Sequence, residues 1–235
     1  MNTKNEIPMA NMVYETLKSK DLDQITSKGP KYWHEHFKAL VNGIPYLGGL
    51  AATELQVYLD YKDEEFFRKF VRFLTHLKDV PPEERDKFTE EVKEKSNDFP
   101  GNVIMGLVDR MDNINKEEAM ARLVIARIQG QISIEDFFRL SVLLERIPYV
   151  DFEKLPEYAV PFYDESGDTE LLYSTGALVQ QTIDSMGDDK YILSKLGVLL
   201  LKWGFDVEVG CQQSSQTVVN LPLAGGEDIK SMMER

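Results

Sequence analysis

The chain has very few of the residues from which disulfide frameworks, zinc sites and histidine-based active sites are built. Its 235 residues include one cysteine, Cys211, and three histidines, His34, His36 and His76. A single cysteine forms neither an internal disulfide nor a zinc cluster, so a reducing compartment is expected. His34 and His36 are two apart on an expected helix, whereas a helical metal pair needs a spacing of three or four.

Long apolar runs and basic charge are also scarce. No stretch approaches the length of about 18 apolar residues that a membrane-spanning helix requires, and the first residues, MNTKNEIPMANM, do not resemble a secretory signal. The net charge of −13 disfavours binding to nucleic acid and to anionic membrane surfaces. We therefore expect a cytoplasmic protein that binds a protein partner or forms a homo-oligomer, with peripheral membrane contact disfavoured.

Helical periodicity dominates residues 8–148. The pattern predicts helices over 8–20, 31–43, 63–80, 80–95, 99–114, 115–130 and 133–148. Asn115 with Glu118 forms a variant capping box, Gly130 is a typical helix stop, and Ser133 is a typical N-cap. In the helix over 80–95 we expect only Phe88 and Val92 to be clearly buried, with the charged residues in solvent.

The pattern changes after Pro148. Residues 177–184 favour a strand, and residues 190–205 begin extended and continue as a helix after a turn at SMGDD. The predicted fold class is mainly α. It comprises an antiparallel helical bundle over 1–148, a small α+β module over 149–210 that is winged-helix-like, and a loosely ordered tail over 211–235.

Most of the chemical motifs that we tested fail. The glycines of NGIPYLGGLAATE (42–54) lack the lysine and Ser/Thr of a phosphate-binding loop. GQISIEDFF (130–138) resembles half of an EF-hand, but Ile125 and Arg127 occupy positions where calcium needs oxygen ligands. His76 lies too close to Arg72 for the arginine–histidine signature of HEPN-type ribonucleases. We therefore expect no catalytic residues, no metal and no cofactor.

The acidic residues at 109–118 leave two interpretations open. Asp109 and Asp112 are three apart on one helix, with Glu117 and Glu118 just beyond them, a spacing that can hold Mg²⁺. Lysine and arginine residues lie close in the sequence, so a surface salt-bridge network is the alternative.

Residues 44–147 carry a family resemblance. FVRFLTHLKDVPPEERDKF and the paired-helix unit ending in GQISIEDFFRL, followed by KYILSKLGVLLLKW, resemble small bacterial helical proteins of the abortive-infection alpha type. They are more distantly similar to TerB-like helical domains. The resemblance covers nearly half of the chain and rests on packing and capping positions, so it transfers no site residues. It implies a cytoplasmic bacterial protein with a role in phage defence or stress response.

Three functions follow from these observations. The favoured one is a non-enzymatic protein-interaction module; the alternatives are a winged-helix transcription regulator and a metal-dependent enzyme using the acids at 109–118. DTELLYSTG, at the position of a recognition helix, is acidic and has no lysine or arginine, so phosphates would repel it.

The apolar segment 44–53 is the candidate contact surface. Its four large apolar residues, Ile44, Tyr46, Leu47 and Leu50, could form an exposed patch that meets a partner. Alternatively, Gly48, Gly49, Ala51 and Ala52 allow close packing of this segment against a neighbouring helix.

Overall fold

The computed structural model describes residues 6–28, 63–162, 167–181 and 190–209. The described α-helices are α1 (Glu6–Lys18), α2 (Leu22–Ser27), α5 (Asp63–Leu77), α6 (Pro82–Ser96), α7 (Pro100–Asp109), α8 (Ile114–Ile128), α9 (Ile134–Arg146), α10 (Asp168–Thr175) and α11 (Lys195–Phe205). Two short 3-10 helices, η1 (Tyr149–Asp151) and η2 (Leu155–Ala159), precede α10, and the strands β1 (Leu178–Gln181) and β2 (Lys190–Leu193) follow it.

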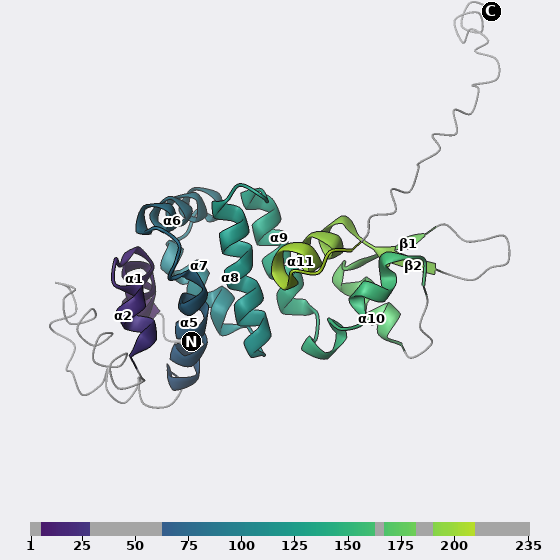
Figure 1. The fold of residues 1–235 in the computed structure, drawn as a ribbon, viewed down its shortest axis with the longest axis horizontal. Helices are drawn as coiled ribbons and strands as arrows, with labels where there is room; N and C mark the ends of the chain where they lie inside the picture. The colour runs from purple at the N-terminus through teal and green to yellow at the C-terminus, as the bar shows by residue number, and fades with distance from the viewer. Residues whose placement is uncertain (1–5, 29–62, 163–166, 182–189, 210–235) are drawn as a thin grey trace, which may run out of the picture.

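The predicted fold class is confirmed. The chain is mainly α-helical, and its described strands form a small antiparallel sheet near the C-terminal end of the described residues. In Figure 1 the helices α1, α2, α5, α6 and α7 lie at one end, α8 and α9 lie in the middle, and α11 lies between them and the hairpin. The order of helix, hairpin and helix is as the sequence predicts, while the comparison with a winged helix and the boundaries at 148 and 210 stay predictions.

Helix ends follow the capping residues, with one correction. Ser133 caps α9, where its side chain accepts a hydrogen bond from the Asp136 amide at 3.0 Å. Gly130 has a positive φ of 72° just after α8, as a helix stop requires. The predicted cap at Asn115 is wrong: Asn113 is the N-cap of α8, and its Oδ1 accepts from the Asn115 amide at 2.9 Å. The cap comes earlier because α7 ends at Asp109 instead of continuing to residue 114.

Arg85 corrects the expectation for the charged residues of α6. Its side chain is 2% exposed, and Nε donates a hydrogen bond to the carbonyl of Leu17 at 2.8 Å, while Nη2 donates to the carbonyl of Ser19. Nη1 donates to the carbonyls of Leu77 at 3.1 Å and Val80 at 2.8 Å. Leu17 and Leu77 lie in the last turns of α1 and α5, where carbonyls lack an intrahelical N–H donor, and Ser19 and Val80 follow these helices. The Leu77 carbonyl also accepts from the Val80 amide at 3.1 Å. One buried guanidinium therefore caps two helices.

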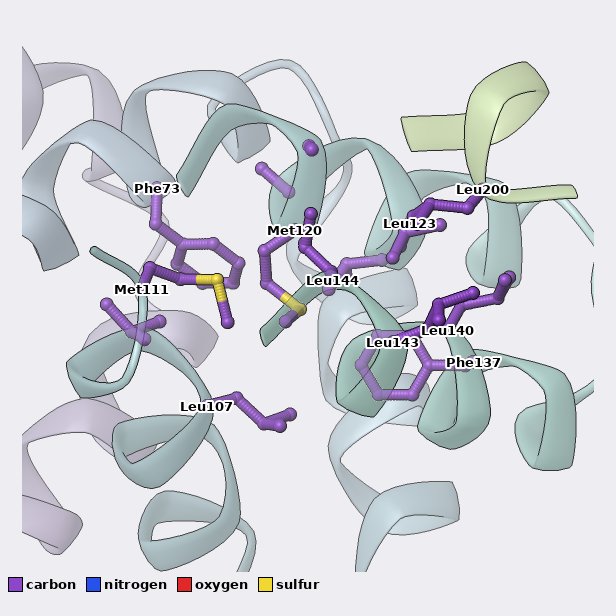
Figure 2. Packing of buried hydrophobic residues seen from close by; sticks show 14 of the residues in the cluster. Phe73, Leu107, Met111, Met120, Leu123, Phe137, Leu140, Leu143, Leu144 and Leu200 are labelled. Carbon is purple, nitrogen blue, oxygen red and sulfur yellow. The ribbon is translucent and has the colours of Figure 1, made fainter. Parts of the chain in front are cut away.

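The hydrophobic core continues from the bundle into the α+β region. Phe73 of α5, Leu107 of α7, Met120 of α8 and Leu144 of α9 belong to one buried cluster that also includes Leu200 of α11. Figure 2 shows these side chains converging from the five helices. Because α11 packs against α8 and α9, the helix after the hairpin completes the core of the bundle.

Two glycines allow elements to approach closely. A Cβ at Gly101 of α7 would lie 1.9 Å from the carbonyl oxygen of Ala10 in α1, and one at Gly197 of α11 would lie 2.4 Å from that of Ala177. Both distances are far below van der Waals contact, so only glycine fits at either position without a shift of the backbone.

The first prediction concerns Arg85. Replacement by methionine keeps much of the apolar stem but leaves four carbonyls without this donor, so Arg85→Met should lower the free energy of unfolding by about 3 to 5 kcal/mol. Arg85→Lys should cause a smaller loss than Arg85→Met but still destabilise the protein, because one ammonium group cannot donate to both helix ends as a guanidinium does. Urea denaturation followed by circular dichroism measures the change.

Lys87 provides the matched control, since it is exposed on the same helix. Lys87→Met should change the free energy of unfolding by no more than about 0.5 kcal/mol. A loss of less than about 1 kcal/mol for Arg85→Met would contradict the capping role.

Candidate functional site

The residues predicted to contact a partner lie outside the described part of the chain. Ile44, Tyr46, Leu47 and Leu50 all fall between residues 29 and 62. Whether they are exposed, or whether the neighbouring small residues pack against a helix, therefore stays a prediction. Cys211, His34 and His36 also lie outside the described residues.

The acids at 109–118 separate into individual ion pairs. Asp112 Oδ1 lies 2.8 Å from Lys116 Nζ, and Glu118 Oε1 lies 2.8 Å from Arg122 Nη2. Glu117 faces α5, where its Oε2 is 3.6 Å from Arg72 Nη1. Within the described residues no three acidic, histidine or cysteine side chains gather to hold a metal ion. The arrangement is that of a salt-bridge network, with each of these three acids facing a different cation.

Lys116 and Glu117 are both buried, although they are adjacent in the sequence. Lys116 is fully buried and donates to the carbonyl of Glu145 at 3.3 Å. Glu117 is 2% exposed, and its Oε2 accepts no hydrogen bond from any described group. Burial raises the pKa of Glu117 above its ordinary value, while the charges of Arg72 and Lys69 oppose the rise.

The EF-hand-like turn is held by an arginine of the protein itself. Arg127 donates from Nε and Nη2 to the carboxylate of Glu91, at 2.9 Å each, and from Nη1 to the carbonyl of Ile132 at 3.1 Å. Its guanidinium thus bridges α6 and the turn between α8 and α9. This arrangement explains physically why an arginine stands at a position where a calcium loop would carry an oxygen ligand.

His76 is exposed in the last turn of α5. Arg72, one turn earlier, faces Glu117. Among the residues that the structure describes, no carboxylate forms an ion pair with His76, so it has no described group that would orient it as a general base.

Exposed apolar side chains concentrate in the α+β region. Six large apolar side chains are exposed among the described residues, and five of them lie between positions 150 and 179. They are Val150 (72% exposed), Val160 (50%), Leu171 (43%), Tyr173 (46%) and Val179 (46%), and the sixth is Val142 of α9. We refer to the surface of α10 and β1 that exposes Leu171, Tyr173 and Val179 as the α10–β1 face, because α10 packs against β1. The strand register places Val179 on the opposite side of the hairpin from Tyr191.

Local structure fixes the orientation of this face. Helix α10 buries Thr169 and Leu172, and Leu171 and Tyr173 are exposed on either side of Leu172. The Tyr158 hydroxyl lies 2.7 Å from Thr169 Oγ1 in a buried hydrogen bond that joins η2 to α10. The ring of Tyr173 contacts that of Tyr191 on β2, with centroids 5.2 Å apart.

The α10–β1 face lies in a strongly acidic part of the chain. Residues 149–181 contain seven acids and one base, Lys154, a net charge of −6. Lys154 forms an ion pair with Asp168 at the start of α10. Glu153, Glu157 and Glu170 are exposed. The combination of exposed apolar side chains and net negative charge in this part of the chain suits a partner surface that is both apolar and basic.

Comparisons with known proteins do not identify a family. No family model, no curated protein and no solved structure matches this chain. Among the described helices, none combines the length and the apolar character needed to cross a bilayer.

The second prediction concerns the buried carboxyl of Glu117. Because burial raises its pKa in the folded state, the folded protein binds this proton more tightly than the unfolded chain does. The resulting stability is present at low pH and is lost as the pH rises above the ordinary glutamate pKa of about 4.3. Glu117→Gln removes this titration. The free energy of unfolding of the variant, relative to that of the natural protein, should therefore increase as the pH rises from about 4 to about 7.

Urea denaturation at several pH values measures this difference. Glu94→Gln on α6 is the control, because Glu94 is exposed and its substitution should leave the pH dependence unchanged. A constant difference between Glu117→Gln and the natural protein across this range would contradict the prediction.

Proposed function

We propose that the protein is a non-enzymatic protein-interaction module that binds a basic partner through the α10–β1 face. The observation that carries the proposal is the concentration of exposed apolar side chains between residues 150 and 179. Single exposed apolar residues are normal, but a group of them on adjacent elements is typical of an interaction surface. Tyr173 is of the residue type that most often contributes strongly to binding.

Charge supports a basic partner over a second copy of the chain. The net charge of −6 over residues 149–181 would meet the same charge in a symmetric dimer. A partner with lysines and arginines around an apolar centre would gain both steering and complementarity. The resemblance of residues 44–147 adds the context to the proposal: a cytoplasmic bacterial protein acting in phage defence or stress response.

The same charges disfavour the transcription-regulator alternative. Helix α10 precedes the hairpin, at the position of a recognition helix, and carries Asp168 and Glu170 without a lysine or arginine. Phosphate contacts require cations on such an element. The metal-enzyme alternative loses support because Asp112, Glu117 and Glu118 each face a cation of the protein.

The third prediction tests the interaction face by capture from cells of the native host. Tyr173→Ser combined with Leu171→Ser should reduce capture of a specific protein by about tenfold or more, since truncation of a central aromatic residue commonly costs at least about 2 kcal/mol. Capture should also weaken at high salt, because charge contributes to recognition. Crosslinking followed by quantitative mass spectrometry measures the yield.

Val142→Ser on α9 is the matched control, because Val142 is exposed to a similar degree outside the face. Equal loss of capture for the control and the double variant would contradict the proposed function. Concentration-dependent self-association that the double variant abolishes would replace the basic partner with a second copy. Sequence-specific DNA binding at low salt would favour the regulator instead.

A further inference from the structure

A hollow of about 320 Å³ lies between α8, η1 and the C-terminal end of α11. It is separate from the α10–β1 face, because its lining comes from residues 115–122, 149–156 and 201–207. We call it the α8–α11 cleft. Its volume is within the range of small-molecule sites and is large enough for one extended side chain.

Aromatic rings form much of the wall of the α8–α11 cleft. Phe152 and Phe205 are in contact, with ring centroids 4.4 Å apart, and Tyr149 lies 6.4 Å from Phe152. Leu201 and Gly204 of α11 add apolar surface without polar side chains. This wall offers ring faces and dispersion contacts to an apolar stem or to a cation.

The polar groups of the cleft include several hydrogen-bond acceptors beside the guanidinium of Arg122. The Asn115 side-chain amide donates to the Tyr149 hydroxyl, an arrangement that leaves the amide oxygen as an acceptor. Glu118 and Glu153 contribute carboxylates. Glu153 is exposed and forms no ion pair with a described residue.

The cations near the cleft are already compensated. Arg122 is paired with Glu118 at 2.8 Å. Lys116, whose Nζ lies 5.8 Å from the Phe152 ring, is paired with Asp112 at 2.8 Å. The charge that remains available in the cleft is therefore the negative charge of Glu153.

A neighbouring hollow of about 480 Å³ provides a comparison. It lies farther along α8, and its aromatic residue is Trp203. There Lys202 Nζ of the protein itself lies 4.7 Å from the ring centroid. In the α8–α11 cleft no described lysine or arginine covers the ring of Tyr149 or Phe205, so these rings can receive a cation from outside.

We propose that the α8–α11 cleft binds the side chain of an arginine or lysine of a protein partner. The apolar stem would lie against Tyr149 and Phe205, and the cationic end would meet Glu153 and the acceptor of Asn115. The inference rests on the proposed function, since it assumes a basic protein partner. It adds a second contact point, made up of different residues from the α10–β1 face.

The fourth prediction tests the cleft with blocked amino acids. N-acetyl-arginine methylamide, titrated into the full chain, should shift the backbone NMR signals of residues 115–122 and 201–207. N-acetyl-citrulline methylamide has nearly the same shape without the charge, and it should bind about fivefold or more weakly. Glu153→Gln should weaken arginine binding to a similar extent, because it removes the uncompensated carboxylate.

Glu84→Gln on α6 is the matched control, since Glu84 is exposed and does not line the cleft. It should retain the arginine affinity of the natural protein. Equal affinities for arginine and citrulline, full affinity in Glu153→Gln, or signal shifts confined to other residues would each overturn the proposal.

Two further measurements separate the possible sources of the cation and the two proposals. Agmatine, a free guanidine, should bind no more tightly than blocked arginine; a preference of tenfold or more would make the ligand a small molecule instead of a protein side chain. Leu171→Ser/Tyr173→Ser should bind arginine normally. If that variant also keeps full capture of the partner, the proposed function is contradicted and arginine binding in the cleft is not. If Glu153→Gln alone keeps full arginine affinity, arginine binding in the cleft is contradicted and the α10–β1 face is not.

Discussion

The guanidinium of Arg85 is the contact on which the arrangement of the bundle depends. It donates to carbonyls at the C-terminal ends of α1 and α5. Leu17 of α1 is 68 residues away from Arg85 along the chain, and Leu77 of α5 is 8 residues away. Burial lowers its pKa from the ordinary value, yet an arginine keeps its charge at neutral pH. Its acceptors are neutral carbonyls, so the stabilisation comes from the aligned dipoles of two helix ends and from hydrogen bonds to carbonyls that have no donor within the helix. A sideways or lengthwise shift of either helix would break these bonds together.

Helix α8 connects the part of the bundle held by Arg85 to the rest of the molecule. It packs against α5 on one side and against α9 and α11 on the other. Lys116 and Glu117 are buried at its first turns, where Lys116 meets Asp112 and the Glu145 carbonyl while Glu117 meets Arg72. Buried charges of this kind contribute little net stability, but each tolerates few alternative partners. The same helix presents Asn115 and Glu118 to the α8–α11 cleft. The geometry of the cleft is therefore set by a helix fixed from several directions, which suits a pre-formed binding site.

Local patterns in the sequence predicted the local parts of this fold. The β-favouring residues before and after SMGDD predicted the hairpin, and the Ser133 cap and the Gly130 stop lie where the structure has them. The errors concern burial of charge. Arg85 lies in a run of charged residues that is typical of a solvated surface, and nothing in the run shows that carbonyls from distant segments meet it. The burial of Lys116 and Glu117 could not be predicted from the sequence for the same reason. The cleft was not predictable, because its walls come from segments up to 92 residues apart, between Asn115 and Val207. The acidity of α10 could be predicted from the sequence, because it depends on composition alone.

The acidic charge also explains how an apolar face can stay exposed. Apolar side chains at Leu171, Tyr173 and Val179 would favour contact between copies of the chain. Residues 149–181 hold nearly half of the net charge of −13, so any approach of two such regions brings like charges together at short range. Repulsion of this kind weakens self-association without removing the apolar contact surface. A basic partner meets attraction where a second copy meets repulsion, so one distribution of charge both keeps the face accessible and selects what binds to it.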